Sequence, residues 1–111
     1  MANPSPTGND STNTVLDCMR LCLQCANECI DHDGKDMANC IKLCQICADT
    51  CVLCLKCMAS GVQVHRPICG ACAAVCDACA AECSSGRTAT MQQCADACTR
   101  CAVACREMAG A

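Results

Sequence analysis

The sequence contains no phenylalanine, tyrosine or tryptophan, and only 16 of its 111 residues are leucine, isoleucine or valine. A domain of this length normally fills its core with those side chains, so another material must fill this one. The chain has no aromatic rings to stack on bases, and its net charge of −3 disfavours a phosphate backbone, so we expect no nucleic-acid partner. It also has no run of about 18 apolar residues, so we expect no membrane-spanning segment.

Cysteine and alanine replace the missing residues, with 19 and 18 copies respectively. So many cysteines in a short chain are typical of a secreted disulfide scaffold. However, the cysteine count is odd, and the N-terminal segment has neither the basic start nor the apolar stretch of a secretory signal. We therefore expect a cytoplasmic protein, in which abundant cysteine indicates metal binding.

The cysteines follow a repeated spacing, C-x3-C-x2-C-x3-C, which starts at Cys18, Cys40, Cys72 and Cys94. Within each successive pair the offset is 22 residues, which predicts an internal duplication of a two-helix hairpin, residues 13–60 and 67–108. All the cysteines are candidate metal ligands: Cys18, Cys22, Cys25, Cys29, Cys40, Cys44, Cys47, Cys51, Cys54, Cys57, Cys69, Cys72, Cys76, Cys79, Cys83, Cys94, Cys98, Cys101 and Cys105.

Alternating steps of four and three residues place a whole cysteine unit on one face of an α-helix, whereas a strand would scatter it to both faces. Gly61 is suited to end a helix, Pro67 to occupy a first helical position and Thr88 to cap a helix. We predict helices over 13–32, 36–60, 67–84 and 88–108, preceded by a disordered tail at residues 1–12. Short connections make neighbouring helices antiparallel, so residues 13–111 should form an all-α, up-down-up-down four-helix bundle with a cysteine-lined core.

Three interpretations of the buried thiols compete: small hydrophobes, disulfides and metal ligands. Thiolates favour Cu(I), zinc and iron–sulfur clusters. Zinc takes four tetrahedral ligands and iron–sulfur clusters are wrapped by loops, whereas a continuous row of sulfur suits multiple Cu(I) ions, on the order of one per thiol. A zinc or heavy-metal buffer of the metallothionein type and a redox protein using iron–sulfur clusters or disulfides stay open as alternatives.

Extending the helical register beyond the cysteines gives soft ligands at both ends of the bundle. His32, Met37 and Met91 fall at one end, and thioether and imidazole groups there are suited to receive Cu(I). The opposite end has Val15, Met58, His65 and Met108. We take His32, Met37, Met91 and His65 as further candidate ligands, and the sequence leaves open which end admits metal.

A second apolar row on the first helix predicts a subunit interface, because part of it would be exposed on a monomer. Its members are Leu16, Met19, Leu23, Ala26 and Ile30, and the second helix carries Leu43, Ile46, Thr50, Leu53 and Cys57. We therefore expect a homo-oligomer. No spacing indicates a catalytic set, so we do not expect an enzyme.

The segments CMRLCLQCANEC, CIKLCQICADTC, CGACAAVCDACAAEC and CADACTRCAVAC resemble those of the bacterial copper storage proteins. The resemblance covers about residues 14–108. Because a secretory signal is not found in the sequence, the chain is similar to the cytosolic branch of that family. It implies a homotetramer of four-helix bundles filled with Cu(I), with histidine or methionine at an open end that His32, Met37 and Met91 match. Cys57 falls off the register of the other cysteines. The resulting prediction is cytosolic Cu(I) storage or sequestration in a preformed bundle.

Overall fold

The computed structural model describes residues 10–33 and 37–110, with the side chains of His32 and Asp33 left out. The described part consists of four helices and contains no strand. They are α1 (Ser11–Asp33), α2 (Ala38–Ser60), α3 (His65–Ser84) and α4 (Ala89–Gly110). The predicted all-α bundle is confirmed, and each helix contains one of the four cysteine units.

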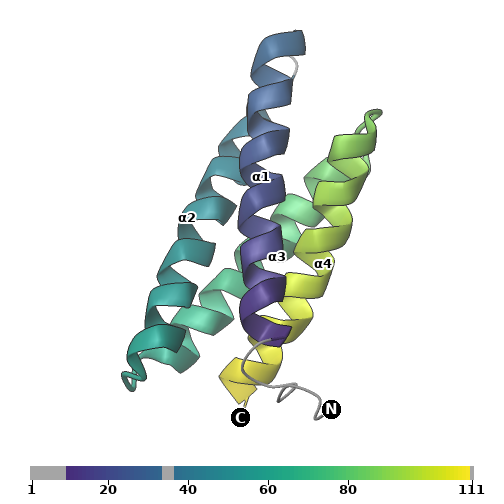
Figure 1. Ribbon diagram of the computed structural model, residues 1–111. Helices are drawn as coiled ribbons and strands as arrows, with labels where there is room; N and C mark the ends of the chain where they lie inside the picture. Colours follow the sequence, from purple (N-terminus) through teal and green to yellow (C-terminus); the bar gives the residue numbers. More distant parts are fainter. Residues whose placement is uncertain (1–9, 34–36, 111) are drawn as a thin grey trace, which may run out of the picture.

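Successive helices run antiparallel, and α4 returns to lie beside α1 (Figure 1). The start of α1, the α2–α3 turn and the end of α4 therefore lie at one end of the bundle, which we call the His65 end. The end of α1, the start of α2 and the α3–α4 loop lie at the other, which we call the Met91 end. This up-down-up-down order is the predicted one.

The core consists mainly of sulfur. All 19 cysteines are buried, and 17 of the 19 are at most 1% exposed. Val15, Leu21, Met91 and several alanines complete the core, and no polar or charged side chain of the described residues is buried. The predicted cysteine-lined interior is thus confirmed, because the four-three spacing turns every unit toward the bundle axis.

The residues at the helix ends explain where several of the helices begin and end. Gly61 ends α2 in the left-handed conformation, with φ of 69°, and its N–H donates to the carbonyl of Cys57 at 3.0 Å, as predicted for a C-terminal glycine. Thr88 caps α4, since its Oγ1 accepts the N–H of Met91 at 3.1 Å. The prediction that Pro67 opens the third helix was wrong, because α3 begins at His65. Pro67 still fits there, since a first-turn residue needs no N–H donor.

Helix α3 is long and apolar enough to cross a membrane by length and composition. A core helix of a bundle passes the same test, and the five cysteines of α3 are buried against its neighbours. We interpret its apolar character as core composition, and the absence of a membrane span stays a prediction. The division into a tail and two duplicated hairpins also stays a prediction, with α1 beginning at Ser11.

Candidate metal centre

The thiols form a connected column along the bundle axis. At the Met91 end, the Sγ of Cys40 lies 3.9 Å from that of Cys29 and 3.6 Å from that of Cys83. At the His65 end, the Sγ of Cys54 lies 3.4 Å from that of Cys69 and 4.0 Å from that of Cys105. Between these ends the sulfurs of all four helices continue in contact, so a metal ion anywhere along the axis has thiols on several sides.

Sets of four thiols lie close enough to share one ion, with their Sγ atoms within 4.8 Å of one another. Neighbouring sets share members, so one sulfur can bridge two ions and the sets form a single extended site. Five of these sets are Cys18/Cys22/Cys47/Cys98, Cys18/Cys47/Cys51/Cys76, Cys22/Cys79/Cys94/Cys98, Cys25/Cys44/Cys83/Cys94 and Cys51/Cys72/Cys76/Cys101.

Every cysteine is a free thiol. The closest thiol–thiol hydrogen bond in the described part, 3.4 Å between Cys54 and Cys69, is well beyond the roughly 2.05 Å of a disulfide bond. The column therefore consists of reduced sulfur, the form that binds soft metal ions.

Burial favours the protonated form of three thiols near the ends of the column, those of Cys29, Cys40 and Cys69. Removal from water, together with the charge of neighbouring thiolates, raises the pKa of Cys29 and of Cys40 to about 12. Burial also raises the pKa of Cys69 at the other end. Metal binding at these positions must displace protons, so the affinity for metal depends on pH.

Cys57 is the cysteine that stands apart. It is 6% exposed and lies outside the main core cluster, as its departure from the cysteine register suggests. It lies instead in an open pocket of about 370 Å³ at the His65 end. That pocket is lined by Cys57, Met58, Gly61, His65, Cys69 and Met108. Thiol, thioether and imidazole groups thus meet where the column reaches the surface.

One ring nitrogen of His65 has a backbone partner. Its Nδ1 lies 3.3 Å from the carbonyl oxygen of Val62. A carbonyl can only accept a hydrogen bond, so in the neutral ring this contact favours the tautomer with the proton on Nδ1 and the lone pair on Nε2. A backbone carbonyl commonly fixes the tautomer of a metal-binding histidine in this way.

The Met91 end has a different structure. Met91 is only 4% exposed and fills the end of the core beside Gly86, where a side chain on the glycine would collide with the Sδ and Cε of the methionine. Gln92 fastens the α3–α4 loop, because its Nε2 donates to the carbonyls of Ser84 at 3.1 Å and Gly86 at 2.8 Å. Met91 is therefore held in place by its surroundings.

Hydrogen bonds between helices also join the Met91 end. The hydroxyl of Thr90 on α4 donates to Glu28 Oε2 on α1 at 2.7 Å. The amide of Asn39 on α2 donates to Glu82 Oε1 on α3 at 3.4 Å. All four helices are thus tied to a neighbour at this end.

The candidate ligands outside the cysteines therefore occupy different settings. Met91 is buried and Met37 is partly buried against the core at the Met91 end, while His65 lines the pocket at the other end. The side chain of His32 lies outside the described residues. Met58 and Met108 also line the pocket but were not among the candidate ligands, although the extended helical register names both.

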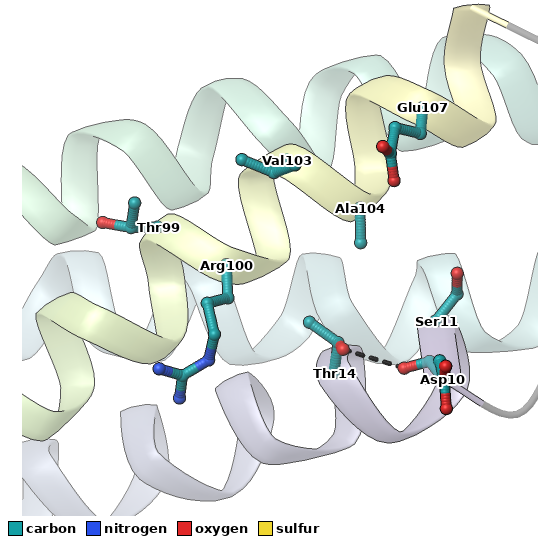
Figure 2. Close-up of a pocket in the computed structure, with 8 residues that line it drawn as sticks. All are labelled: Asp10, Ser11, Thr14, Thr99, Arg100, Val103, Ala104 and Glu107. Atoms are coloured by element: carbon teal, nitrogen blue, oxygen red, sulfur yellow. Dashed lines mark hydrogen bonds between the residues drawn. The ribbon is translucent and has the colours of Figure 1, made fainter. Parts of the chain in front are cut away.

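A second pocket, between the start of α1 and the C-terminal half of α4, has a different chemistry (Figure 2). It contains no sulfur, and its Thr14 hydroxyl donates to the backbone carbonyl of Asp10 at 2.8 Å. Oxygen groups and a guanidinium do not suit a soft metal ion. Its lining residues are Asp10, Ser11, Thr14, Thr99, Arg100, Val103, Ala104 and Glu107.

The second apolar row on α1 divides into two sets. Met19 and Ala26 turn toward the core, whereas Leu16, Leu23 and Ile30 are 40%, 47% and 52% exposed. On α2, Ile46 and Leu53 are exposed to a similar degree. In the described part of the second hairpin the exposed large apolar residue within a helix is Val103. The apolar surface therefore belongs to the first hairpin.

A four-helix bundle with a continuous interior of free thiols defines a protein class built to hold soft metal ions. The family follows from comparison: a sequence model described as copper storage protein matches residues 7–110, and the chain belongs to this family. No curated protein sequence matches the chain.

Solved structures agree with this assignment. The chain is 35% identical to the Cu(I)-bound copper storage protein BsCsp3, with a TM-score of 0.88, over 93% of this chain and 98% of that one. It is equally 35% identical to the apo form of copper storage protein 3 from Bacillus subtilis, with a TM-score of 0.87, over 92% and 98%. A Nitrosospira multiformis protein is 36% identical, with a TM-score of 0.81, over 90% and 92%.

Proposed function

We propose that this protein stores Cu(I) as a multinuclear thiolate assembly inside its preformed bundle. The observation that carries the proposal is the set of 19 buried, free thiols contributed by all four helices, of which all but Cys57 belong to the core cluster. Membership of the copper storage protein family, and the Cu(I)-bound relative, support the same function. We expect storage rather than catalysis, in a reducing compartment such as the cytosol, which keeps free thiols reduced.

The spacing of the sulfurs fits metal–thiolate bonds. A bond of about 2.3 Å places two sulfurs about 4.0 Å apart around a trigonal ion and about 4.6 Å apart around a linear one. The Sγ atoms of each set already lie within 4.8 Å of one another. Small side-chain rotations are therefore enough to admit ions, and the helices need not move.

Charge favours Cu(I) over zinc. A Zn²⁺ ion bound by four thiolates carries a net charge of −2, and several such sites would leave a large uncompensated charge in an apolar interior. None of the described residues buries a cationic side chain that would balance it. One Cu(I) per thiolate is neutral, so filling the column with copper avoids this cost. The capacity we expect is on the order of one ion per thiol.

We propose that the His65 end admits the copper. Its open pocket brings His65, Met58 and Met108 to the first buried thiols of the column. Among the described residues of the Met91 end, the methionine is buried and hydrogen bonds join the helices. The histidine and methionines therefore act as transient ligands that pass Cu(I) to Cys57 and Cys69.

We further propose that the first hairpin forms the interface of a homotetramer. Leu16, Leu23 and Ile30 recur every seven residues, so they form one exposed apolar stripe along α1. Replacing both Leu23 and Ile30 by lysine should dissociate the oligomer without loss of helix. The matched control is Val103→Lys on α4, and light scattering with size-exclusion chromatography gives the mass of each. A monomeric native protein would contradict the proposal.

Storage is tested by anaerobic titration of the reduced protein with Cu(I) against a chromophoric Cu(I) chelator. We expect many tight equivalents, a colourless product and an unchanged far-UV circular dichroism spectrum. Cys51→Ser combined with Cys76→Ser should lower the capacity, whereas Asp49→Ser on the α2 surface should leave it unchanged. Saturation after a few equivalents, or a transition from coil to helix on loading, would contradict storage in a preformed core.

The two histidines provide a matched test of the direction of loading, since one belongs to each end. We expect His65→Ala to slow the transfer of Cu(I) from a chelator complex into the bundle, with total capacity nearly unchanged. His32→Ala should leave the rate close to that of the native protein. The opposite ranking of the two variants would place the mouth at the Met91 end.

A further inference from the structure

The closest thiol pair of the core includes Cys69, which lines the open pocket. Cys54 on α2 and Cys69 on α3 have their Sγ atoms 3.4 Å apart, compared with 3.6 Å or more for the other thiol–thiol hydrogen bonds of the described residues. Cys69 also lines the pocket, whereas Cys54 is fully buried in the core. This pair therefore links the pocket to the thiol column.

The pocket has ligands suited to copper in its oxidised state as well. Cu(II) binds imidazole well, and the Nε2 of His65 carries a free lone pair because Nδ1 donates to Val62. The thiols of Cys57 and Cys69 line the same space. An ion held by His65 is thus placed beside sulfur that can reduce it.

We propose that this mouth also takes up Cu(II) and reduces it, with Cys54 and Cys69 as the electron donors. Two Cu(II) ions accept one electron each, the two S–H bonds break, two protons leave to water and one S–S bond forms between Cys54 and Cys69. The products are two Cu(I) ions and a disulfide. The reaction consumes thiols and is not catalytic unless an external thiol reduces the disulfide again.

The geometry selects this pair over other thiols. Cysteines four residues apart on one helix have poorly directed Cβ atoms, whereas Cys54 and Cys69 lie on facing helices. Their Sγ atoms need approach by only about 1.4 Å to reach a bond length of roughly 2.05 Å. The resulting bond would join α2 to α3 across the turn at Gly61. The inference rests on the proposed storage function, because the remaining thiols retain the Cu(I) that forms.

The chain offers a matched comparison pair at the other end. Cys25 and Cys40 are likewise 15 residues apart and also join successive helices, with their Sγ atoms 3.9 Å apart. They lie near the Met91 end, away from the open pocket. Loss of either pair removes the same number of copper ligands, so only the location of the pair differs.

The experiment uses the reduced full-length protein, without oxygen, and two equivalents of Cu(II) sulfate. We expect the Cu(II) signal in electron paramagnetic resonance to disappear. After the Cu(I) is removed with a chelator from the unfolded protein, the thiol count should have fallen from 19 to 17, a loss of two. Peptide mapping without reductant should then find one disulfide, between Cys54 and Cys69. A persistent Cu(II) signal, or disulfides spread over many pairs, would overturn the inference.

Variants separate this reduction from storage. Cys54→Ser and Cys69→Ser should each lose the reduction, and Cys25→Ser should retain it. His65→Ala keeps every thiol and should slow the reduction, which provides a readout even where a cysteine variant folds poorly. Equal slowing in Cys25→Ser overturns the choice of pair. A parallel arm loads the same variants with Cu(I): failure there counts against storage, whereas normal Cu(I) loading without Cu(II) reduction counts against this inference alone.

Discussion

The two ends of the bundle contain the same kinds of soft side chain and differ in how they are held. At the Met91 end a methionine is 4% exposed, and hydrogen bonds link α1 to α4 and α2 to α3. At the His65 end two methionines and a histidine line an open pocket. The difference shows that a thioether can fill the end of a core or line an opening, and that its surroundings decide between the two.

The largest effect on stability should come from alkaline pH, because it acts on buried thiols near the Met91 end. The pKa of Cys29 and of Cys40 is raised to about 12 by burial, above the value of about 8.5 for a free cysteine. A raised pKa means that stability is fully present below about pH 8.5 and is lost as pH rises toward 12. We expect the reduced, copper-free protein to unfold over this range, as followed by circular dichroism.

The copper-loaded protein is the control for this pH dependence. Its thiols have already lost their protons to the metal, so its helix content should change little over the same range. Equal alkaline sensitivity of the loaded and copper-free forms would show that groups other than the buried thiols cause the unfolding.

Truncating the buried side chain of Met91 should have the next largest effect on stability. Met91→Ala removes a buried side chain and should lower the free energy of unfolding by about 2–5 kcal/mol, measured by urea denaturation of the reduced protein. Met108→Ala, at a partly buried position of the open end, should cost about 1 kcal/mol. Similar costs at the two positions would mean that both ends are packed alike.

The two glycines at the ends of the bundle should respond differently to substitution. In Gly86→Ala the new Cβ would lie 2.8 Å from the Cβ of Met91 as well as close to its Sδ and Cε, at a cost of about 1–3 kcal/mol. Gly61→Ala meets no atom within 4 Å, but φ of 69° is unfavourable for alanine by about 1–2 kcal/mol.

Measuring both substitutions in a Met91→Ala variant distinguishes the two causes, which are crowding at Gly86 and the positive φ at Gly61. In a Met91→Ala protein the cost of Gly86→Ala should fall, because Sδ and Cε, the two closest atoms, are gone and only the contact with the Cβ stays, whereas that of Gly61→Ala should persist. Additive effects for Gly86 and Met91 would contradict direct contact between them. Urea denaturation of the single and double variants measures this coupling.

The cap of α4 should contribute least. Thr88→Ala removes the acceptor for the Met91 N–H and should cost about 1 kcal/mol in the same assay. Thr99→Ala is the control, since its hydroxyl donates to the Ala95 carbonyl of its own helix and its loss should change stability by less than about 0.5 kcal/mol. Equal effects of the two substitutions would contradict a stabilising role for the Thr88 cap of α4.

Much of this protein was predictable from local spacing. The four-three recurrence from Cys18 to Cys105 predicted the helices and their inward thiols, and Gly61 and Thr88 predicted two boundaries that the structure confirms. The start of α3 at His65 was not predicted, because a helix can begin two residues before a first-turn proline such as Pro67 without losing a hydrogen bond.

The apolar row on α1 shows the limit of such reasoning. Met19 and Leu23 belong to one four-three row, yet Met19 turns inward and Leu23 is 47% exposed. Periodicity gives the angle of a residue around its own helix but not where the neighbouring helices stand. The copper ligands themselves stay a prediction from chemistry, and the titrations above test them.

The sequence by itself determined that sulfur fills the interior, because the spacing of the cysteines matches the period of a helix and few other apolar residues compete for the core. Only the tertiary structure decided that Met91 is buried at one end of the core while His65 lines an open pocket at the other. That outcome depends on loop shape and on contacts between residues far apart in the chain, such as Thr90 with Glu28, which no local pattern contains.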